Sequence, residues 1–190
     1  MTTEDINWVQ LALNGDSDAF TYIVESYQKP VYNLCYRMLG NAMEAEDAAQ
    51  ETFWRAYRAL NRYDPKRSFI TWLLSIAAHY CIDQHRKRQL PTFAMELLPE
   101  GNIPVQSPGP ENLLIQSEDD RRVHAMLDTL NPKDRAAIVL RYWYEFSEVE
   151  ISQTLSLTVS AVKSRLHRAR RMLASNWQGP VPQTVLKEAI

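Results

Sequence analysis

Hydrophobic residues along this chain recur mostly at intervals of three and four, the spacing of helices that bury one side. A first helix is expected from about Asp5 to Asn14. A long apolar stripe then begins at Phe20 and ends at a Gly40-Asn41 break, with Pro30 expected to bend the helix. Runs of alternating polar and apolar residues are few. The pattern therefore predicts an all-α protein.

The next expected helix, roughly 43–60, carries two different stripes. One is apolar and rich in small residues, and comprises Ala45, Ala49, Phe53, Ala56 and Leu60. The other is polar and comprises Asp47, Gln50, Glu51, Trp54 and Arg58. Trp54 either covers its own helix or acts as an aromatic anchor for a partner protein. The stretch alone leaves both interpretations open.

A turn-rich segment from Asn61 to Ser68 precedes a helix with an apolar start and a basic end. Phe69 and Trp72 are interpreted as core residues of this helix. From His79 to Arg88 the sequence becomes polar and basic. Aromatic and basic residues interleaved in this way suit single-stranded nucleic acid, because rings stack on bases while cations follow phosphates.

The stretch from Gln89 to Asp120 separates two parts of the chain. It contains no Lys or Arg, and half of the ten prolines fall within it. Such a composition predicts an extended acidic linker. The expected architecture is thus two small helical domains, an N-terminal bundle at 1–90 and a second domain at 117–176, joined by a flexible linker at 91–116 and followed by a tail at 177–190.

The second domain ends in two helices joined by a tight turn. Ser147 and Glu150 form a capping box at the start of the first, whose apolar residues Val149, Ile151 and Leu155 are expected on one side. After a break at Ser156 and Leu157, Thr158 caps the second. Before them, Asn131 and Pro132 begin another helix.

The last helix has a buried stripe and a basic face. Val162, Leu166, Ala169 and Leu173 recur at intervals of four, three and four. The other face carries Lys163, Ser164, Arg165, His167, Arg168, Arg170 and Arg171. A basic face alone is most often solvated or binds protein. Together with the capped helix before it, however, it favours a helix-turn-helix domain whose second helix enters the DNA major groove.

Composition and net charge limit the kinds of binding site that this chain can contain. The net charge is −2, so DNA binding must depend on local basic patches rather than on bulk attraction. Cys35 and Cys81 are expected to be reduced core thiols; His79 and His85 flank Cys81, but no further pair completes a zinc site. No metal, cofactor, membrane span or catalytic group is expected. The sequence indicates a non-enzymatic cytoplasmic protein.

Three segments in order resemble the extracytoplasmic-function (ECF) class of bacterial RNA polymerase sigma factors. They are AEDAAQETFWRAYRAL at 45–60, FITWLLSIAAHYCIDQHRKR at 69–88, and LNPKDRAAIVLRYWYEFSEVEIS running into VKSRLHRARRML. The resemblance spans about residues 5–173. It implies a transcription initiation factor whose partners are core RNA polymerase, promoter DNA and an anti-sigma factor.

The resemblance also implies roles for particular residues. Core polymerase would be bound by Asp47, Gln50, Glu51, Trp54 and Arg58. The melted minus-ten element would be held by Arg67, His79, Tyr80, Asp83, Arg86, Lys87 and Arg88. The minus-thirty-five element would be read by Arg141, Thr158, Ser160, Lys163, Ser164, His167, Arg168 and Arg171.

Three departures from the family pattern affect these roles. His79 stands where Asn is common, Ser156 stands at a turn position where Gly is usual, and Ser160-Ala161 replaces a common Gly-Thr. Two other functions fit parts of the pattern. One is a stand-alone dimeric helix-turn-helix regulator, and the other is a protein that only sequesters polymerase.

Overall fold

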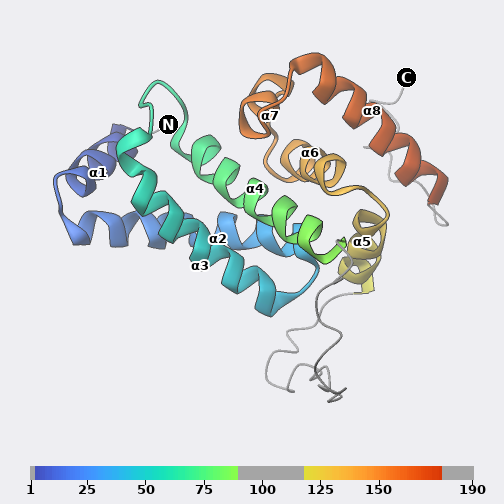
Figure 1. Ribbon diagram of the computed structural model, residues 1–190, viewed down its shortest axis with the longest axis horizontal. Helices are drawn as coiled ribbons and strands as arrows, with labels where there is room; N and C mark the ends of the chain where they lie inside the picture. Colours follow the sequence, from blue (N-terminus) through green and yellow to red (C-terminus); the bar gives the residue numbers. More distant parts are fainter. Residues whose placement is uncertain (1–2, 90–117, 177–190) are drawn as a thin grey trace, which may run out of the picture.

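The computed structural model describes residues 3–89 and 118–176, and every regular element in this part of the chain is a helix, as predicted (Figure 1). The helices are α1 Thr3–Leu13, α2 Ser17–Leu39, α3 Ala42–Ala59, the 3-10 helix η1 Leu60–Arg62, α4 Phe69–Gln89, α5 Glu118–Asp128, α6 Pro132–Trp143, α7 Glu148–Thr154 and α8 Val159–Asn176. The predicted linker at 91–116 and tail at 177–190 lie outside the described residues.

Helix boundaries in the first domain follow from local capping. The side chain of Asp16 accepts hydrogen bonds from the Asp18 and Ala19 amides at 2.9 and 3.1 Å, which caps α2. Gly40 ends α2 with a φ of 74°, a left-handed conformation that glycine adopts without steric cost. The side chain of Asn41 then caps α3 through the Glu44 amide. Helix α2 continues through Pro30.

Helices α2, α3 and α4 enclose the core of the first domain, and α1 packs on α2. The core contains fully buried residues of α2 and α4 such as Leu34, Met38 and Leu73. Phe69 is buried as well, and the ring of Trp72 lies 5.2 Å from that of Tyr63. Phe69 is therefore a core residue, as predicted, whereas Trp72 is partly buried and packs against the core.

Helix α6 is the central element of the second domain. Asn131 caps it through the Asp134 amide at 3.0 Å, and Pro132 occupies its start, as the sequence indicates. Every residue from Asp134 to Leu140 is buried. A helix buried on all sides must pack against neighbours on more than one face. Its neighbours are α7 and α8 on one side and α2 and α4 of the first domain on another.

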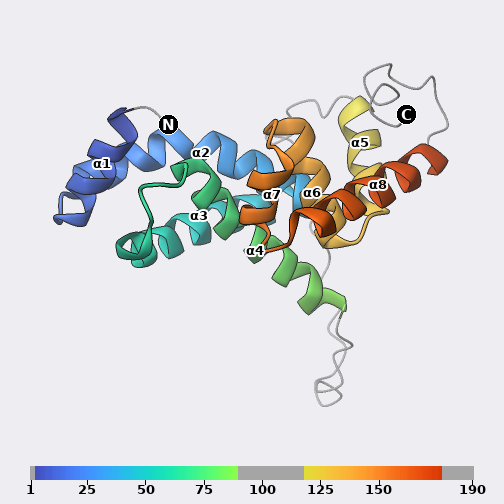
Figure 2. The same cartoon turned by 90° about the horizontal axis from the view of Figure 1, so that it is seen from above.

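The two halves of the chain pack directly against each other (Figures 1 and 2). Arg135 on α6 donates a hydrogen bond from Nη1 to the Met38 carbonyl oxygen at 2.7 Å. The hydroxyl of Tyr144 donates to the Pro30 carbonyl oxygen at 2.5 Å. The guanidinium of Arg37 lies 4.3 Å from the centroid of the Trp143 ring. These contacts join residues about a hundred positions apart, and nothing in the local sequence pattern indicates them.

Candidate functional site

The first helix of the helix-turn-helix begins with the predicted capping box. The Ser147 amide donates to Glu150 Oε2 at 2.8 Å, and the Glu150 amide donates to Ser147 Oγ at 3.2 Å. Ile151 and Leu155 are buried as predicted. The placement of Val149 on the same side was wrong, because its side chain is 53% exposed. Residues two apart differ by about 200° around a helix, so Val149 and Ile151 point in nearly opposite directions.

The turn between α7 and α8 depends on one strained residue. Ser156 has a φ of 53°, in the left-handed region that disfavours residues with a Cβ. This is the position at which the resemblance implies glycine. Two residues later the hydroxyl of Thr158 accepts a hydrogen bond from the Ala161 amide at 3.2 Å and caps α8, as predicted. The turn thereby fixes the direction in which α8 leaves α7.

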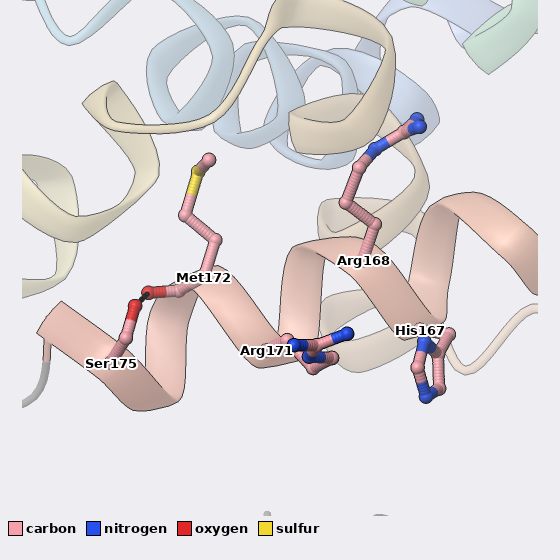
Figure 3. Close-up of a pocket in the computed structure, with 5 residues that line it drawn as sticks. All are labelled: His167, Arg168, Arg171, Met172 and Ser175. Atoms are coloured by element: carbon pink, nitrogen blue, oxygen red, sulfur yellow. Dashed lines mark hydrogen bonds between the residues drawn. The ribbon is translucent and has the colours of Figure 1, made fainter.

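Helix α8 buries one stripe and exposes another. Val162, Leu166 and Ala169 are buried against the domain core. The exposed residues include every member of the predicted minus-thirty-five set on this helix, namely Ser160, Lys163, Ser164, His167, Arg168 and Arg171. A hollow of about 490 Å³ runs along the second half of α8 and is lined by His167, Arg168, Arg171, Met172 and Ser175 (Figure 3). In that view Arg168 and Met172 project to one side of the helix and His167 to the other.

A buried carboxylate on α6 anchors two arginines of α8. Asp134 accepts hydrogen bonds from Arg168 Nε at 2.8 Å and Nη2 at 3.0 Å, and from Arg165 Nη1 at 2.7 Å. Burial raises the pKa of the Asp134 carboxyl, but the hydrogen bonds from both arginines and Asn131 outweigh burial and hold that pKa below its ordinary value. Asp134 is therefore ionised at neutral pH. The sequence analysis missed this residue, which lies more than thirty positions from its partners.

Other predicted contacts of the second domain lie beside α8. Arg141, in the last turn of α6, is half-buried and donates from Nη1 to the Phe146 carbonyl oxygen at 3.2 Å. Lys163 is exposed, and its amine lies 3.6 Å from a carboxylate oxygen of Glu148 on α7. An exposed pair of this kind is weak and screened by salt, so it leaves Lys163 available to other anions.

The predicted minus-ten residues cluster at the second half of α4, except Arg67, which is exposed in the turn before it. His79 is exposed, with Nδ1 at 2.7 Å from the Ser75 carbonyl oxygen. The Tyr80 ring is half-buried beneath the guanidinium of Arg55, whose carbon lies 4.8 Å from the ring centroid. The remaining members of the set are Asp83, Arg86, Lys87 and Arg88, and all but Asp83 are exposed.

Several of these charges are paired within the first domain. Arg86 Nη2 lies 3.2 Å from the Asp83 carboxylate. Arg88 pairs with Glu44 at the start of α3. His85, which was not in the predicted set, has Nε2 at 2.6 Å from the Met38 carbonyl oxygen and so joins α4 to the end of α2. Its role in the described structure is packing between helices.

The polar stripe on α3 forms a continuous surface on the face opposite the core. Its members recur at intervals of three and four, which places them along one side of the helix. Trp54 is 54% exposed, and the Arg58 guanidinium carbon lies 4.5 Å from the centroid of its ring. Glu51 accepts a hydrogen bond from Arg55 Nε at 2.7 Å. Asp47 and Gln50 are exposed. Trp54 therefore does not belong to the core of the first domain.

A helical bundle joined to a helix-turn-helix domain defines a class of DNA-binding transcription proteins, and comparison with known proteins narrows that class. Residues 23–90 match the family model described as Sigma-70 region 2, and residues 120–173 match Sigma-70, region 4. The chain is 40% identical over 167 residues to the ECF RNA polymerase sigma factor SigW of Bacillus subtilis, an alignment that covers 84% of this chain and 89% of SigW. It is 38% identical over 153 residues to the ECF sigma factor SigE of Mycolicibacterium smegmatis, covering 80% and 58% of the two chains.

Solved structures show the same fold. The structure of CnrH in complex with the cytosolic domain of CnrY matches with a TM-score of 0.67 and 25% identity, covering 90% of this chain and 96% of that one. The sigma factor RpoE from Bartonella quintana, crystallised with the anti-sigma factor NepR, matches with a TM-score of 0.64 and 21% identity, covering 88% and 96%.

This chain belongs to the ECF class of the sigma-70 family of RNA polymerase sigma factors. It is a transcription initiation factor that directs polymerase to promoters, as the sequence predicted. Family membership disfavours the stand-alone dimeric regulator. None of the helices in the described ranges is both long enough and apolar enough to cross a membrane.

Proposed function

We propose that the chain reads promoters with two separate surfaces, one in each half of the molecule, while a third surface holds core polymerase. The domain at 1–90 binds core polymerase and captures the melted minus-ten strand. The domain at 117–176 reads the minus-thirty-five element, and 91–116 joins them. The observation that best supports this division is the exposed polar stripe of α8, which lies opposite its buried stripe.

For the upstream element, α8 enters the major groove. Its polar stripe then faces the bases, and the residues that make contact are Thr158, Ser160, Lys163, Ser164, His167, Arg168 and Arg171, with Arg141 at a neighbouring phosphate. Sequence is read by hydrogen bonds to base edges, whereas contacts to phosphate fix the register. Lys163 and Arg171 lie on the exposed face of α8, where either contact can form.

For the downstream element, the second half of α4 holds a single strand. Bases released from the duplex stack on aromatic rings while cations follow the phosphates. His79 and Tyr80 supply the rings, with Asp83 beside them, and Arg67, Arg86, Lys87 and Arg88 supply the positive charge. His79 replaces the Asn that is common in the family, so the base preferred at this site does not carry over from the family.

For polymerase, the stripe of Asp47, Gln50, Glu51, Trp54 and Arg58 on α3 is the docking surface. Trp54 is an exposed aromatic side chain surrounded by polar groups, which is the composition of an energetically important interface centre. Asp47 and Glu51 bring negative charge that complements a basic surface on the partner.

An anti-sigma factor is a further partner in this proposal. In one of the matching structures the sigma factor is bound to a protein named as an anti-sigma factor. The chain acts by association and carries out no reaction of its own. Its place of action is the cytoplasm, where polymerase meets DNA.

Run-off transcription tests this proposal. Purified core polymerase with the full chain is expected to start RNA at a fixed position on a promoter from the genome of origin, whereas core polymerase alone is not. A protein that only sequesters polymerase would bind core yet yield no transcript from any promoter, and that result would exclude the proposal.

Arg168→Ala is expected to weaken promoter binding at the upstream element. A bidentate arginine contact to guanine is worth about 1–3 kcal/mol of discrimination, so the loss is about 5- to 150-fold. Footprinting of the polymerase complex measures it. Lys133→Ala is the control. Lys133 is exposed on α6, outside the proposed surface, so its substitution removes one positive charge without changing that surface. An unchanged footprint with Arg168→Ala would remove this residue from the reading surface.

A further inference from the structure

Asp134 connects the buried helix α6 to the helix proposed to read DNA. Its side chain is only 3% exposed, although it carries a charge. Besides the arginine contacts, it accepts a hydrogen bond from Asn131 Nδ2 at 2.6 Å, while its own amide is held by the Asn131 cap. The carboxylate is therefore fixed both through its backbone and through its side chain.

The two contacts with Arg168 use one edge of the guanidinium group. Nε and Nη2 point at the two carboxylate oxygens in a parallel pair. The other edge, formed by Nη1 and the second hydrogen of Nη2, has no hydrogen-bond partner among the described residues. The Arg168 side chain is 57% exposed, so this free edge is open to solvent. Two parallel N–H groups at such an edge match the O6 and N7 atoms of guanine.

We infer that Asp134 is a positioning residue, which holds the free edge of Arg168 ready for a guanine and thereby sets the base preference at one pair of the upstream element. The inference rests on the proposed reading of that element by α8. An unsupported arginine must lose side-chain freedom when it binds, whereas one already held by a carboxylate has lost much of it beforehand.

The charges in the cluster are consistent with this role. One buried carboxylate faces two arginines, so the cluster keeps a net positive charge and still attracts DNA. Arg165 is 24% exposed and makes a single hydrogen bond to Asp134. Arg165 is thus the less exposed of the two arginine partners, and Arg168, at 57%, is the more exposed one. The lowered pKa of Asp134 keeps the carboxylate ionised at neutral pH.

The test compares base preference rather than overall affinity. Core polymerase is reconstituted with the full chain, and transcripts are sequenced from a promoter library whose upstream element is randomised. With the natural chain, guanine is expected to be preferred at one position that depends on Arg168. Asp134→Asn keeps the shape of the side chain but presents an amide in place of one carboxylate oxygen. The guanine preference at that position is expected to fall about 5- to 150-fold, with the other positions unchanged.

Controls separate positioning from stability. Arg165→Met loosens the same cluster but keeps both contacts between Asp134 and Arg168, so the guanine preference is expected to remain. In an Arg168→Ala background, Asp134→Asn is expected to cause no further change in preference. If circular dichroism shows that Asp134→Asn does not fold, Asp134→Glu is used, which keeps the charge and displaces it by one methylene; a reduced guanine preference is again expected.

Each result bears on a different claim. If the natural chain gives no transcripts from any library member, the proposed function itself fails. If transcripts appear but folded Asp134 variants keep the natural preference at every position, only the positioning role is wrong. Tighter binding by Asp134→Asn without a change in preference would also overturn it, because Asp134 would then compete with DNA for Arg168.

Discussion

Trp54→Ala is expected to lower the affinity of the chain for core polymerase by about 30-fold. Truncating a central aromatic residue of an interface commonly costs about 2 kcal/mol or more. Trp54 is 54% exposed in the described structure, and its ring contacts Arg58 rather than the core of the domain. Binding to immobilised core polymerase measures the loss. Circular dichroism is expected to show that the first domain remains folded.

Glu51→Lys tests the charge of the same surface. Reversing the charge is expected to weaken polymerase binding about as much, because a basic partner surface then meets a lysine. Glu25→Lys makes the same change on an exposed part of α2 and is expected to bind normally. Equal losses for both substitutions would indicate a general charge effect. Unfolding of Trp54→Ala would instead assign Trp54 to the stability of the first domain.

Arg135→Met is expected to separate the two halves of the free chain. The substitution keeps a long side chain but replaces the guanidinium group with an apolar one, and so removes the buried hydrogen bond to the Met38 carbonyl oxygen. Hydrogen bonds to charged groups contribute about 1.5–3 kcal/mol, so the balance between packed and separated forms shifts about 10- to 150-fold. Small-angle X-ray scattering is expected to show a larger radius of gyration than for the natural chain.

Two further variants identify the contact responsible. Arg135 also pairs with Asp128 within the second domain at 2.8 Å, and Asp128→Asn removes that pair without touching the first domain. Its scattering is expected to match the natural chain. Tyr144→Phe removes only the hydroxyl bonded to the Pro30 carbonyl oxygen and is expected to loosen the packing to a smaller extent. Natural scattering profiles for both Arg135→Met and Tyr144→Phe would show that these contacts do not hold the halves together.

Local patterns were sufficient to predict the helices and their caps. The Ser147 capping box, the Asn131-Pro132 start of α6 and the buried stripe of α8 all depend on residues within a few positions of one another. The error at Val149 also has a local cause, because Val149 and Ile151 are two residues apart and their side chains therefore lie about 200° apart around the helix. The exposed position of Trp54 could be suspected from its polar neighbours, but only the packed structure decides it.

Contacts between distant segments could not be predicted in this way. Asp134 occupies an ordinary position in the first turn of α6, where an acidic residue is favourable at any helix start. Its two arginine partners lie on another helix, and their side chains meet it only because α8 crosses α6 at that point. In the same way, the sequence around Arg135 indicates an ordinary charged residue of an amphipathic helix. Arg135 is instead only 3% exposed, and it donates a hydrogen bond to the Met38 carbonyl oxygen near the end of α2.

The packing of α7 against both α4 and α8 limits how far apart the two proposed DNA-reading helices can be. Packed helices lie about 8–10 Å apart, so a single intervening helix separates the axes of α4 and α8 by roughly 20 Å. Elements centred about 25 base pairs apart are separated by about 85 Å along straight DNA. Under the proposed roles of α4 and α8, the described arrangement therefore cannot engage both elements of one promoter at once. Each contact that stabilises this arrangement would then have to be broken before both elements are bound, which reduces the free energy of promoter binding.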